Sequence, residues 1–230
     1  MAASSRQKNR ALQAEKAAAT RRRIVTAAAS QFVHYGYLST TMADIAREAG
    51  VAVRTVYLSF GGKVEVLVAA LDIAIVGDDD PIPVLERPWF QRLVDEPDGV
   101  AALGVFVAAA SEIIDRVYPL YTVTRDGSAD AELAEVLKRN KRLRLLTHGQ
   151  VARVLADKPG FADNLSPRQA TEIVYTLMSQ ETYGLLVVDQ GWTVAGWSAW
   201  VKRLLRLELF PPESSGGCSA MPLDSNRPTT

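Results

Sequence analysis

The segment at residues 53–60 (VRTVYLSF) carries side chains that can recognise the edges of base pairs. On a helix, with about 100° between successive residues, one side would hold Val53, Val56, Tyr57 and Phe60, and the other Arg54, Thr55, Leu58 and Ser59. The Arg54 guanidinium can form two hydrogen bonds with a guanine, Thr55 can bond a base edge or a phosphate, and Leu58 can contact a thymine methyl. The pattern predicts a short helix that packs through its apolar side and offers the other side to a major groove.

Two more residues beside this segment could bind phosphates. Tyr57 lies at the edge of the apolar side, so its hydroxyl could reach the DNA backbone. Lys63 follows Gly61-Gly62, where the first N–H groups of the next helix are left open, and together they would form a second phosphate clamp. Taken singly, an exposed arginine is more often a solvated charge, and an edge tyrosine more often covers a core. Their occurrence together favours DNA binding.

Helical patterns on both sides would position this segment. A first helix is predicted from Arg21 to near Gly36, with an apolar residue at every fourth position: Ile24, Ala28 and Phe32. A second helix starts at the capping sequence Thr41-x-x-Asp44 and ends at Gly50, and a fourth opens at Lys63. Short helices joined by a tight turn that contains glycine predict a helix-turn-helix.

Charge is distributed unevenly along this chain of 230 residues, whose formal net charge is zero. Residues 1–63 hold ten Lys and Arg against three acidic residues, a net charge of +7, so the remainder carries −7. A basic surface joined to an acidic body is typical of a protein that binds a polyanion. Residues 1–20 form a basic arm, either a frayed helix or disordered. Its Arg6, Lys8 and Arg10 could enter a neighbouring minor groove. A disordered arm that makes no DNA contact explains the same composition equally well.

The rest of the chain predicts helices and no strand. They are expected near 98–118, 129–156, 166–190 and 193–209, and Ser166-Pro167 is a typical helix start. Residues 77–97 contain four prolines and predict a linker with at most a short helix. The predicted class is all-α: a basic arm (1–20), a three-helix helix-turn-helix domain (21–75), a C-terminal helical domain (76–210) and a disordered tail (211–230).

The N-terminal pattern also resembles a known family. The residues that carry the likeness are Ile24, Ala27, Ala28, Phe32, Gly36, Tyr37, Thr40, Thr41, Ile45, Ala46, Ala49, Gly50, Val51, Thr55, Val56, Tyr57, Phe60, Lys63 and Leu67. Their spacing over residues 21–70 is similar to the DNA-binding domain of the tetracycline-repressor (TetR) family. The segments from Ser166 to Leu186 and from Gly191 to Leu204 are similar to the last two helices of many members.

The resemblance implies a homodimer that binds a palindromic operator in double-stranded DNA, usually as a repressor. A small-molecule effector bound in the C-terminal domain, which also forms the dimer, would release the operator. At positions that touch DNA, mostly at phosphates, the resemblance places Thr41, Thr55, Tyr57 and Lys63. The chain departs from the family at Val53, often lysine, at Arg54, often Gly or Pro, and at Leu58-Ser59, often His-Tyr. Arg54 is therefore the chief candidate for base specificity.

Apolar stripes near the C-terminus offer either plain core or a dimer interface, and periodicity cannot distinguish these. The resemblance favours the interface, with the candidates Leu177, Met178, Trp197, Trp200 and Leu204. An effector cavity could be lined by Trp89, Phe106, Tyr118, Tyr121, His148 and Tyr175. Taken singly, each of these is more often ordinary core or surface. Glu112 could bind a cationic ligand, although a solvent-facing stripe is the simpler interpretation.

Other functional classes have less support. An all-α enzyme is disfavoured because the chain has two histidines, a single cysteine (Cys218) in its polar tail, and no glycine-rich phosphate loop or metal-ligand cluster. No cofactor is expected. A purely interacting helical module is disfavoured by the basic N-terminal part. No apolar run approaches the roughly 18–20 residues of a membrane span, and no signal peptide is visible, so a cytoplasmic protein without membrane contact is expected.

Overall fold

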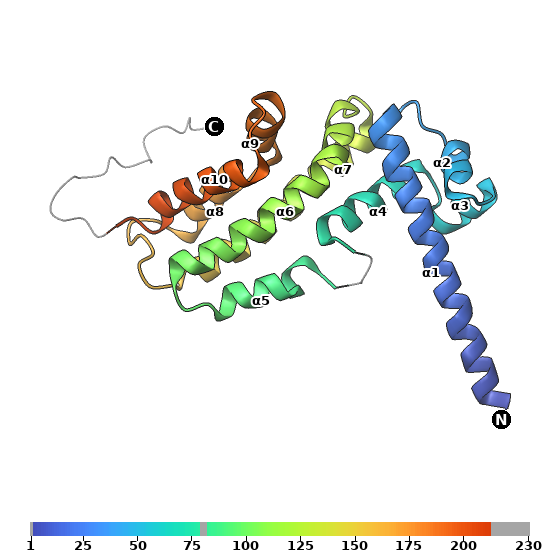
Figure 1. The fold of residues 1–230 in the computed structure, drawn as a ribbon, viewed down its shortest axis with the longest axis horizontal. Coiled ribbons are helices and arrows are strands. Elements are labelled where there is room, and N and C mark those ends of the chain that lie inside the picture. Colours follow the sequence, from blue (N-terminus) through green and yellow to red (C-terminus); the bar gives the residue numbers. More distant parts are fainter. Residues whose placement is uncertain (1, 79–81, 213–230) are drawn as a thin grey trace.

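The computed structural model describes residues 2–78 and 82–212, with residues 2–6, 8 and 9 as backbone only. Within these ranges every regular element is helical, which confirms the predicted all-α class (Figure 1). Cys218 and the part of the predicted tail beyond residue 212 lie outside the described residues. None of the described helices is both long and apolar enough to cross a membrane.

The N-terminal part consists of α1 (Ala2–Tyr35), α2 (Met42–Ala49), α3 (Val53–Phe60) and α4 (Lys63–Val76). Helix α1 packs against α2 and α4, and α3 packs against α2 and α4. The apolar residues predicted to face inward on α1 are buried: Ile24, Ala28 and Phe32. These short helices are stable because their apolar sides share one core, since an isolated helix of eight residues is marginal in water.

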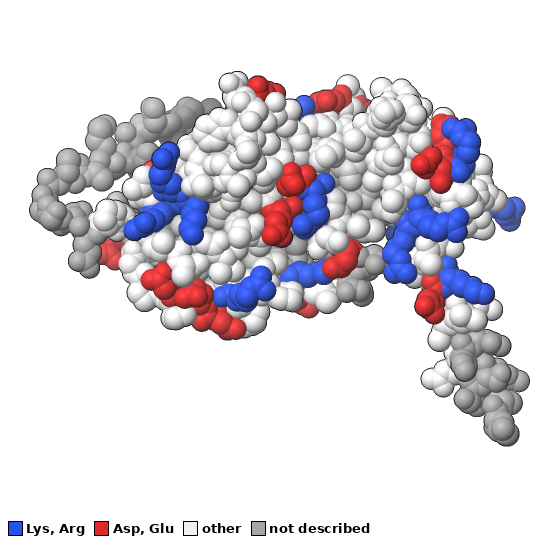
Figure 2. Space-filling model, in the orientation of Figure 1, with Lys and Arg blue, Asp and Glu red and all other residues white. Residues whose placement is uncertain are grey.

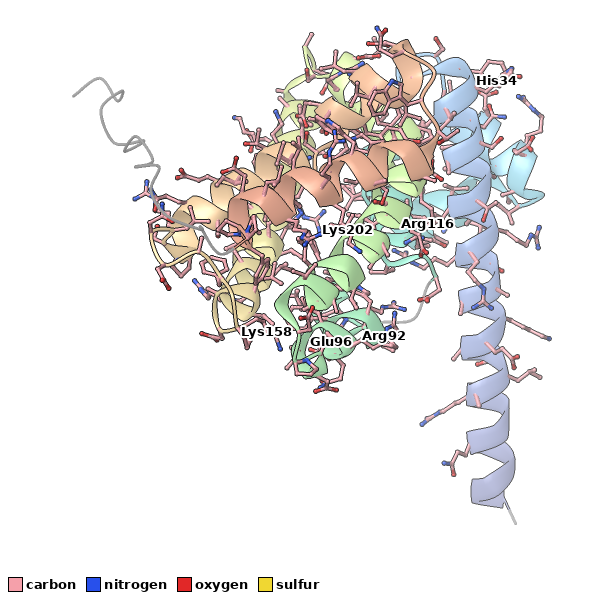
Figure 3. The ribbon with its side chains drawn as sticks, turned by 60° about the vertical axis from the view of Figure 1, so that its left-hand side comes forward. His34, Arg92, Glu96, Arg116, Lys158 and Lys202 are labelled. Atoms are coloured by element: carbon pink, nitrogen blue, oxygen red, sulfur yellow. The ribbon has the colours of Figure 1, made fainter. Side chains whose placement is uncertain are left out.

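The first helix is longer than the sequence pattern indicated. It begins at Ala2, so the basic arm continues the helix that was expected to start at Arg21. Two views show this part of α1 extending away from the rest of the molecule (Figures 1 and 3). Residues 2–20 are rich in alanine and contain neither Gly nor Pro, so their helix propensity is high although residues 10–18 are exposed. Arg10 is exposed, and the side chains of Arg6 and Lys8 lie outside the described residues.

Helix α2 has the predicted caps at both of its ends. The Thr41 hydroxyl accepts a hydrogen bond from the Asp44 backbone N–H at 3.1 Å, and the Asp44 carboxylate accepts one from the Thr41 N–H at 3.1 Å. Gly50 ends α2 with a φ of 63°, in the left-handed region that favours glycine. The two caps fix where α2 starts and stops, and so fix the angle at which α3 begins.

The C-terminal part has α5 (Pro88–Asp95), α6 (Gly99–Asp126), α7 (Ala131–Ala156), α8 (Pro167–Leu177), α9 (Gln180–Tyr183) and α10 (Val194–Leu209). The described residues of the predicted linker at 77–97 contain a 3-10 turn, η1 (Val84–Glu86), and the short helix α5. The predicted cap at Ser166 is present, because its side chain accepts from the Gln169 N–H.

Two helix boundaries differ from the expectation. Pro119 was expected to end a helix near residue 118, but α6 continues through it to Asp126. Val117, Leu120 and Tyr121 are buried on either side of this proline, and their burial outweighs the lost backbone hydrogen bond. The helix expected over 166–190 is broken at Met178, and after α9 it continues as the π-helical segment η2 (Gly184–Asp189). At the break, the Met178 side chain is fully buried in the hydrophobic core.

Two hydrophobic cores share the central helix α6. The first core joins α1–α4 to Val117, Leu120 and Tyr121, near the C-terminal end of α6. The second joins Leu103, Phe106 and other residues nearer its N-terminal end to helices α5, α7, α8 and α10. Figure 1 shows α6 crossing the middle of the molecule between these groups. A shift of α6 would therefore be felt in both cores, because packed cores transmit displacement.

Candidate functional site

Helix α3 presents a more apolar exposed side than the sequence pattern predicted. Arg54 is exposed, Leu58 is 76% exposed and Tyr57 is 51% exposed, while Val56 is fully buried. Val53, which was expected to face inward with Val56, is 40% exposed, while Tyr57, expected at the edge of the apolar side, keeps part of its surface buried. Thr55 and Ser59, expected on the open side, are half-buried. The open side of α3 therefore consists of Val53, Arg54, Tyr57 and Leu58.

The difference between the expected and the observed open side of α3 has a physical cause in the neighbouring helix α1. The Arg21 guanidinium lies over the ring of Phe60, with its central carbon 4.0 Å from the ring centre, and donates a 2.8 Å hydrogen bond to the Ser59 backbone oxygen. These contacts draw the side of α3 that holds Ser59 and Phe60 toward α1. Val53, at the start of α3, lies on the edge of the packed surface.

Two arginines of α1 bind backbone oxygens at the C-terminal ends of α2 and α3. Arg23 donates from Nη2 to the backbone oxygens of Ala49 and Gly50, the latter at 3.0 Å, and so caps α2. Arg21 caps α3 in the same way through Ser59. Cations at helix C-termini also interact favourably with the helix dipole. Part of the basic charge of the N-terminal half therefore holds α3 in place.

Lys63 also binds backbone oxygens of its own chain. Its ammonium donates to the backbone oxygens of Tyr37 at 2.8 Å and Thr40 at 2.9 Å, and lies 4.2 Å from the ring centre of Tyr37. Burial lowers the pKa of Lys63, and nearby Asp130 acts in the opposite direction. An ammonium has three N–H groups, so one is left for a phosphate after these two hydrogen bonds.

Two helix N-termini lie near these residues. At α4 the cap is Gly62, with no side-chain hydrogen bond, although a Cβ built on Gly62 would come within 2.7 Å of the Glu65 carboxylate. An anion approaching that terminus would meet Glu65. At α2 the Thr41 hydroxyl is occupied by its own cap, since it also donates to Asp44 at 2.5 Å. Thr41 itself is exposed.

Exposed basic side chains gather on α1 where it passes this assembly. Arg21, Arg22 and Arg23 are consecutive and exposed, and Figure 2 shows a group of Lys and Arg side chains in this region. Over the rest of the visible face both charges occur, and a second group of basic side chains lies at the end opposite α1. The uneven charge of the sequence thus corresponds to a local concentration of positive charge in the structure.

Two of the five dimer-interface candidates are wrong, because they lie inside the subunit. Met178 and Trp197 are fully buried in the second core, where the Trp197 ring meets Tyr183 edge-on at 5.3 Å between ring centres. Because Met178 and Trp197 have no exposed surface, they cannot contact a second copy. Leu177, Trp200 and Leu204 are half-buried. Large apolar side chains of the C-terminal part that are exposed include Leu146, Leu185, Val188, Trp192 and Leu207.

Four of the effector candidates form one chain of ring contacts across α5, α6, α7 and α8. The ring centre of His148 lies 5.7 Å from that of Phe106 and 6.1 Å from that of Tyr175, and Trp89 lies 6.5 Å from Phe106. His148 is buried. Burial lowers the pKa of this imidazole to about 3, with a further contribution from the charge of Arg144, so the ring is neutral at pH 7.

Arg144 and Glu181, which the sequence analysis did not single out, connect this cluster to the tyrosine candidates. The Arg144 guanidinium carbon lies 4.2 Å from the ring centre of Tyr175, and its Nη1 lies 3.5 Å from the Glu181 carboxylate. The Tyr121 hydroxyl donates to the other oxygen of Glu181 at 3.0 Å. Tyr118 packs beside Tyr121, with ring centres 6.2 Å apart. The four-residue spacing of Arg144 and His148 on α7 was the sequence signal that could have revealed Arg144.

Glu112 lies apart from the other candidates. It is exposed and lines a hollow of about 530 Å³ between the end of α4, α5 and α6, together with Trp89, Arg92 and Arg116. Arg116 donates from Nε to the Ala74 backbone oxygen at 3.1 Å, so it links α6 to the end of α4. Arg92 and Arg116 are labelled in Figure 3.

Comparisons with known proteins agree with this arrangement. Residues 24–70 match the family model described as bacterial regulatory proteins of the tetR family. This chain is 40% identical to the HTH-type transcriptional regulator SrpR of Pseudomonas putida over 90 residues, which are 38% of its length. Identity is also 40% over 90 residues of TtgW, an uncharacterised HTH-type transcriptional regulator that likewise comes from Pseudomonas putida. The matches span 42% of the length of SrpR and 67% of that of TtgW.

Solved structures share the fold at low sequence identity. NalD, the secondary repressor of the MexAB-OprM multidrug efflux pump in Pseudomonas aeruginosa, superposes with a TM-score of 0.64 at 18% identity, covering 85% of this chain and 98% of NalD. The SmeT–triclosan complex gives 0.65 at 20% identity, covering 89% and 99%. FadR from Bacillus subtilis in complex with stearoyl-CoA gives 0.63 at 18%, covering 83% and 98%. The resemblance inferred from the sequence is thereby confirmed: this chain belongs to the tetR family of bacterial regulatory proteins.

Proposed function

We propose that this chain is a sequence-specific DNA-binding regulator, acting as a homodimeric repressor that a small molecule releases from a palindromic operator. The observation that carries the proposal is the open side of α3. It exposes Arg54, Tyr57 and Leu58 while Arg21 and Arg23 hold α3 and α2 from behind. A short, rigidly held helix with one arginine and two large contact residues on its open side fits a major groove.

The DNA contacts divide into two kinds in this proposal. Arg54 and Leu58 lie on the open side of α3 and would contact base edges. Tyr57 and the half-buried Thr55 would contact the DNA backbone at the rim of the helix. Thr41 at the start of α2 and the remaining N–H of Lys63 would add phosphate contacts.

Dimerisation would place two copies of α3 about 34–36 Å apart, one turn of DNA. The exposed apolar residues of the C-terminal part are better placed for the interface than the buried stripe. Leu185 and Val188 lie on η2, and Trp192 follows it, with its ring 6.4 Å from that of Trp200. A second copy of the chain would cover these side chains.

Release would follow from the connections between α4 and the effector-binding part. Arg116 of α6 holds the Ala74 oxygen, and Arg139 of α7 lies 3.3 Å from Asp72 of α4. A ligand that favours another position of α6 and α7 would therefore move α4 and, with it, α3. A tenfold loss of operator affinity requires about 1.4 kcal/mol of differential ligand binding. This proposal is supported by NalD, which is a repressor, and by SmeT and FadR, whose structures hold triclosan and stearoyl-CoA.

Selection of bound duplexes from a random pool tests the proposal directly. We expect a palindromic site, bound far more tightly than random DNA. Arg54→Ala should then reduce discrimination at one base pair of each half-site, worth about 1–3 kcal/mol. Arg203→Ala, which removes an exposed arginine from α10, is the matched control. If Arg54→Ala lowers affinity equally for operator and random DNA, Arg54 does not read a base, and binding to no duplex at low ionic strength would refute DNA binding itself.

A further inference from the structure

We propose that the effector is an uncharged aromatic molecule bearing a hydroxyl or amide group, bound by Asn140, Arg144, His148 and Gln180 between the aromatic rings of α6 and α8. The inference rests on the proposed function, because it takes the C-terminal part to be where the effector binds. What it adds is the site and the chemical class of the ligand.

The observation is a group of buried polar atoms that have no hydrogen-bond partner. Among the described residues, the unpartnered buried side-chain atoms are Asn140 Oδ1, Arg144 Nε, His148 Nδ1 and Gln180 Oε1. Native proteins satisfy nearly all such atoms, and each exception costs free energy. Three of these four atoms belong to residues of α7, and a bound ligand with matching polar groups would satisfy them.

Three of the four residues share one side of α7, and the fourth lies beside a residue that Arg144 contacts. Asn140, Arg144 and His148 follow each other at four-residue intervals on α7, so they share one side of that helix. Gln180 begins α9 and directly precedes Glu181, whose carboxylate lies 3.5 Å from Arg144. Arg144 and His148 both contact the ring of Tyr175 on α8.

Aromatic side chains border this polar cluster. Phe106 of α6 meets His148 edge-on, with an interplanar angle of 84°. Tyr175 lies against Arg144 and His148 from the α8 side. Aromatic rings with a few convergent polar groups are typical of small-molecule sites, and they favour a planar ligand that can stack or meet them edge-on.

The charge of the cluster favours a neutral ligand. Arg144 is positive and Glu181 is negative, and His148 is neutral because burial lowers the pKa of its ring. The Tyr121 hydroxyl donates to Glu181 and stabilises the carboxylate. Because Arg144 and Glu181 pair with each other, a ligand of either charge finds no unpaired opposite charge among them. Placing either net charge in a buried site also costs desolvation free energy.

The free atoms specify what the ligand must offer. Arg144 Nε is a donor, and the two amide oxygens are acceptors. His148 Nδ1 accepts in one neutral tautomer and donates in the other. A hydroxyl can accept from Arg144 Nε and donate to His148 or an amide oxygen, and a carboxamide can do both with separate atoms. A hydrocarbon ring without polar groups would leave the four atoms without hydrogen-bond partners.

Binding of small probes to the full-length protein tests the chemical class. The probes are 4-hydroxybenzamide and 2-naphthol as neutral compounds, benzoate and 2-naphthoate as anions, and benzylamine as a cation. Calorimetry and thermal unfolding should show binding of the neutral pair only. Asn140→Leu and Arg144→Met should weaken that binding at least tenfold. Glu112→Gln, in the separate hollow, should leave it unchanged.

Stability without any probe separates a ligand site from a structural network completed by water. If the orphan atoms await a ligand, Asn140→Leu should raise the thermal midpoint of the free protein while it abolishes binding. A lower midpoint for Asn140→Leu, or unchanged probe binding in both cluster variants, would overturn the inference, as would preferential binding of the charged probes. Operator binding by the same preparations is measured separately, so loss of DNA binding refutes the proposed function while probe binding still decides the site.

Discussion

The guanidinium of Arg21, on α1, donates a 2.8 Å hydrogen bond to the backbone oxygen of Ser59, in the last turn of α3. The same group covers the ring of Phe60. A basic residue on the first helix therefore determines how the third helix is seated, and through it which side chains face outward. Replacement of Arg21 separates this positioning role from a direct contact with DNA.

Arg21→Ala should lower the free energy of unfolding by about 1–2 kcal/mol, because it removes an exposed hydrogen bond and a cation–π contact. It should also weaken binding to operator and random DNA alike, since α3 is seated less firmly. Arg10→Ala removes the same charge from an exposed position on the same helix and serves as the control for stability. Equal unfolding free energies for Arg21→Ala, Arg10→Ala and the parent protein would show that the contact does not stabilise α3.

Lys63→Met tests both roles assigned to Lys63. The substitution leaves the Tyr37 and Thr40 oxygens without their donor, so unfolding by urea should show a loss of about 1–3 kcal/mol. If the third N–H of the ammonium contacts a phosphate, the slope of log affinity against log salt should also fall by about one. A stability loss with an unchanged slope would confine Lys63 to its structural role.

Trp197 and Leu185 should respond in opposite ways to substitution. Trp197 is fully buried, so Trp197→Ala should lower the free energy of unfolding by about 3–5 kcal/mol. Leu185 is 61% exposed, so Leu185→Glu should leave the subunit folded and shift sedimentation from dimer to monomer. Leu38→Glu changes an exposed leucine in the N-terminal part and should leave the dimer intact. An unaltered dimer in Leu185→Glu would place the interface elsewhere.

His148 should make the protein less stable in mild acid. The imidazole titrates near 6.5 in the unfolded chain, and burial lowers its pKa to about 3 in the folded protein. Between these values the unfolded state binds one more proton, so the contribution of His148 to stability is complete above pH 6.5 and is lost as the pH falls. The loss is about 1.4 kcal/mol per pH unit, or about 2 kcal/mol by pH 5. Urea unfolding of His148→Phe across this range should lack that slope, and an identical slope would show that His148 does not titrate on unfolding.

The local pattern of the sequence determined most of the helices and several of their ends. The four-residue spacing of Ile24, Ala28 and Phe32 predicted the buried side of α1, and Thr41-x-x-Asp44 predicted the start of α2. Such features depend on residues within one or two turns of each other, so they can be read without knowing what packs nearby. The spacing of the helix-turn-helix also carried the family resemblance.

Contacts between distant segments decided the rest. Periodicity predicted two sides for α3. The hydrogen bond from Arg21 to Ser59 and its contact with the Phe60 ring determined which side stays exposed. Trp197 was equally compatible with core and interface until the second core enclosed it. Arg144 and Glu181 come together from different helices, 37 positions apart. The sequence by itself thus determines where most helices form, because hydrogen bonds and caps are local. Only the tertiary structure decides which of their sides are buried and which charges meet, because burial depends on the partners that the fold brings together.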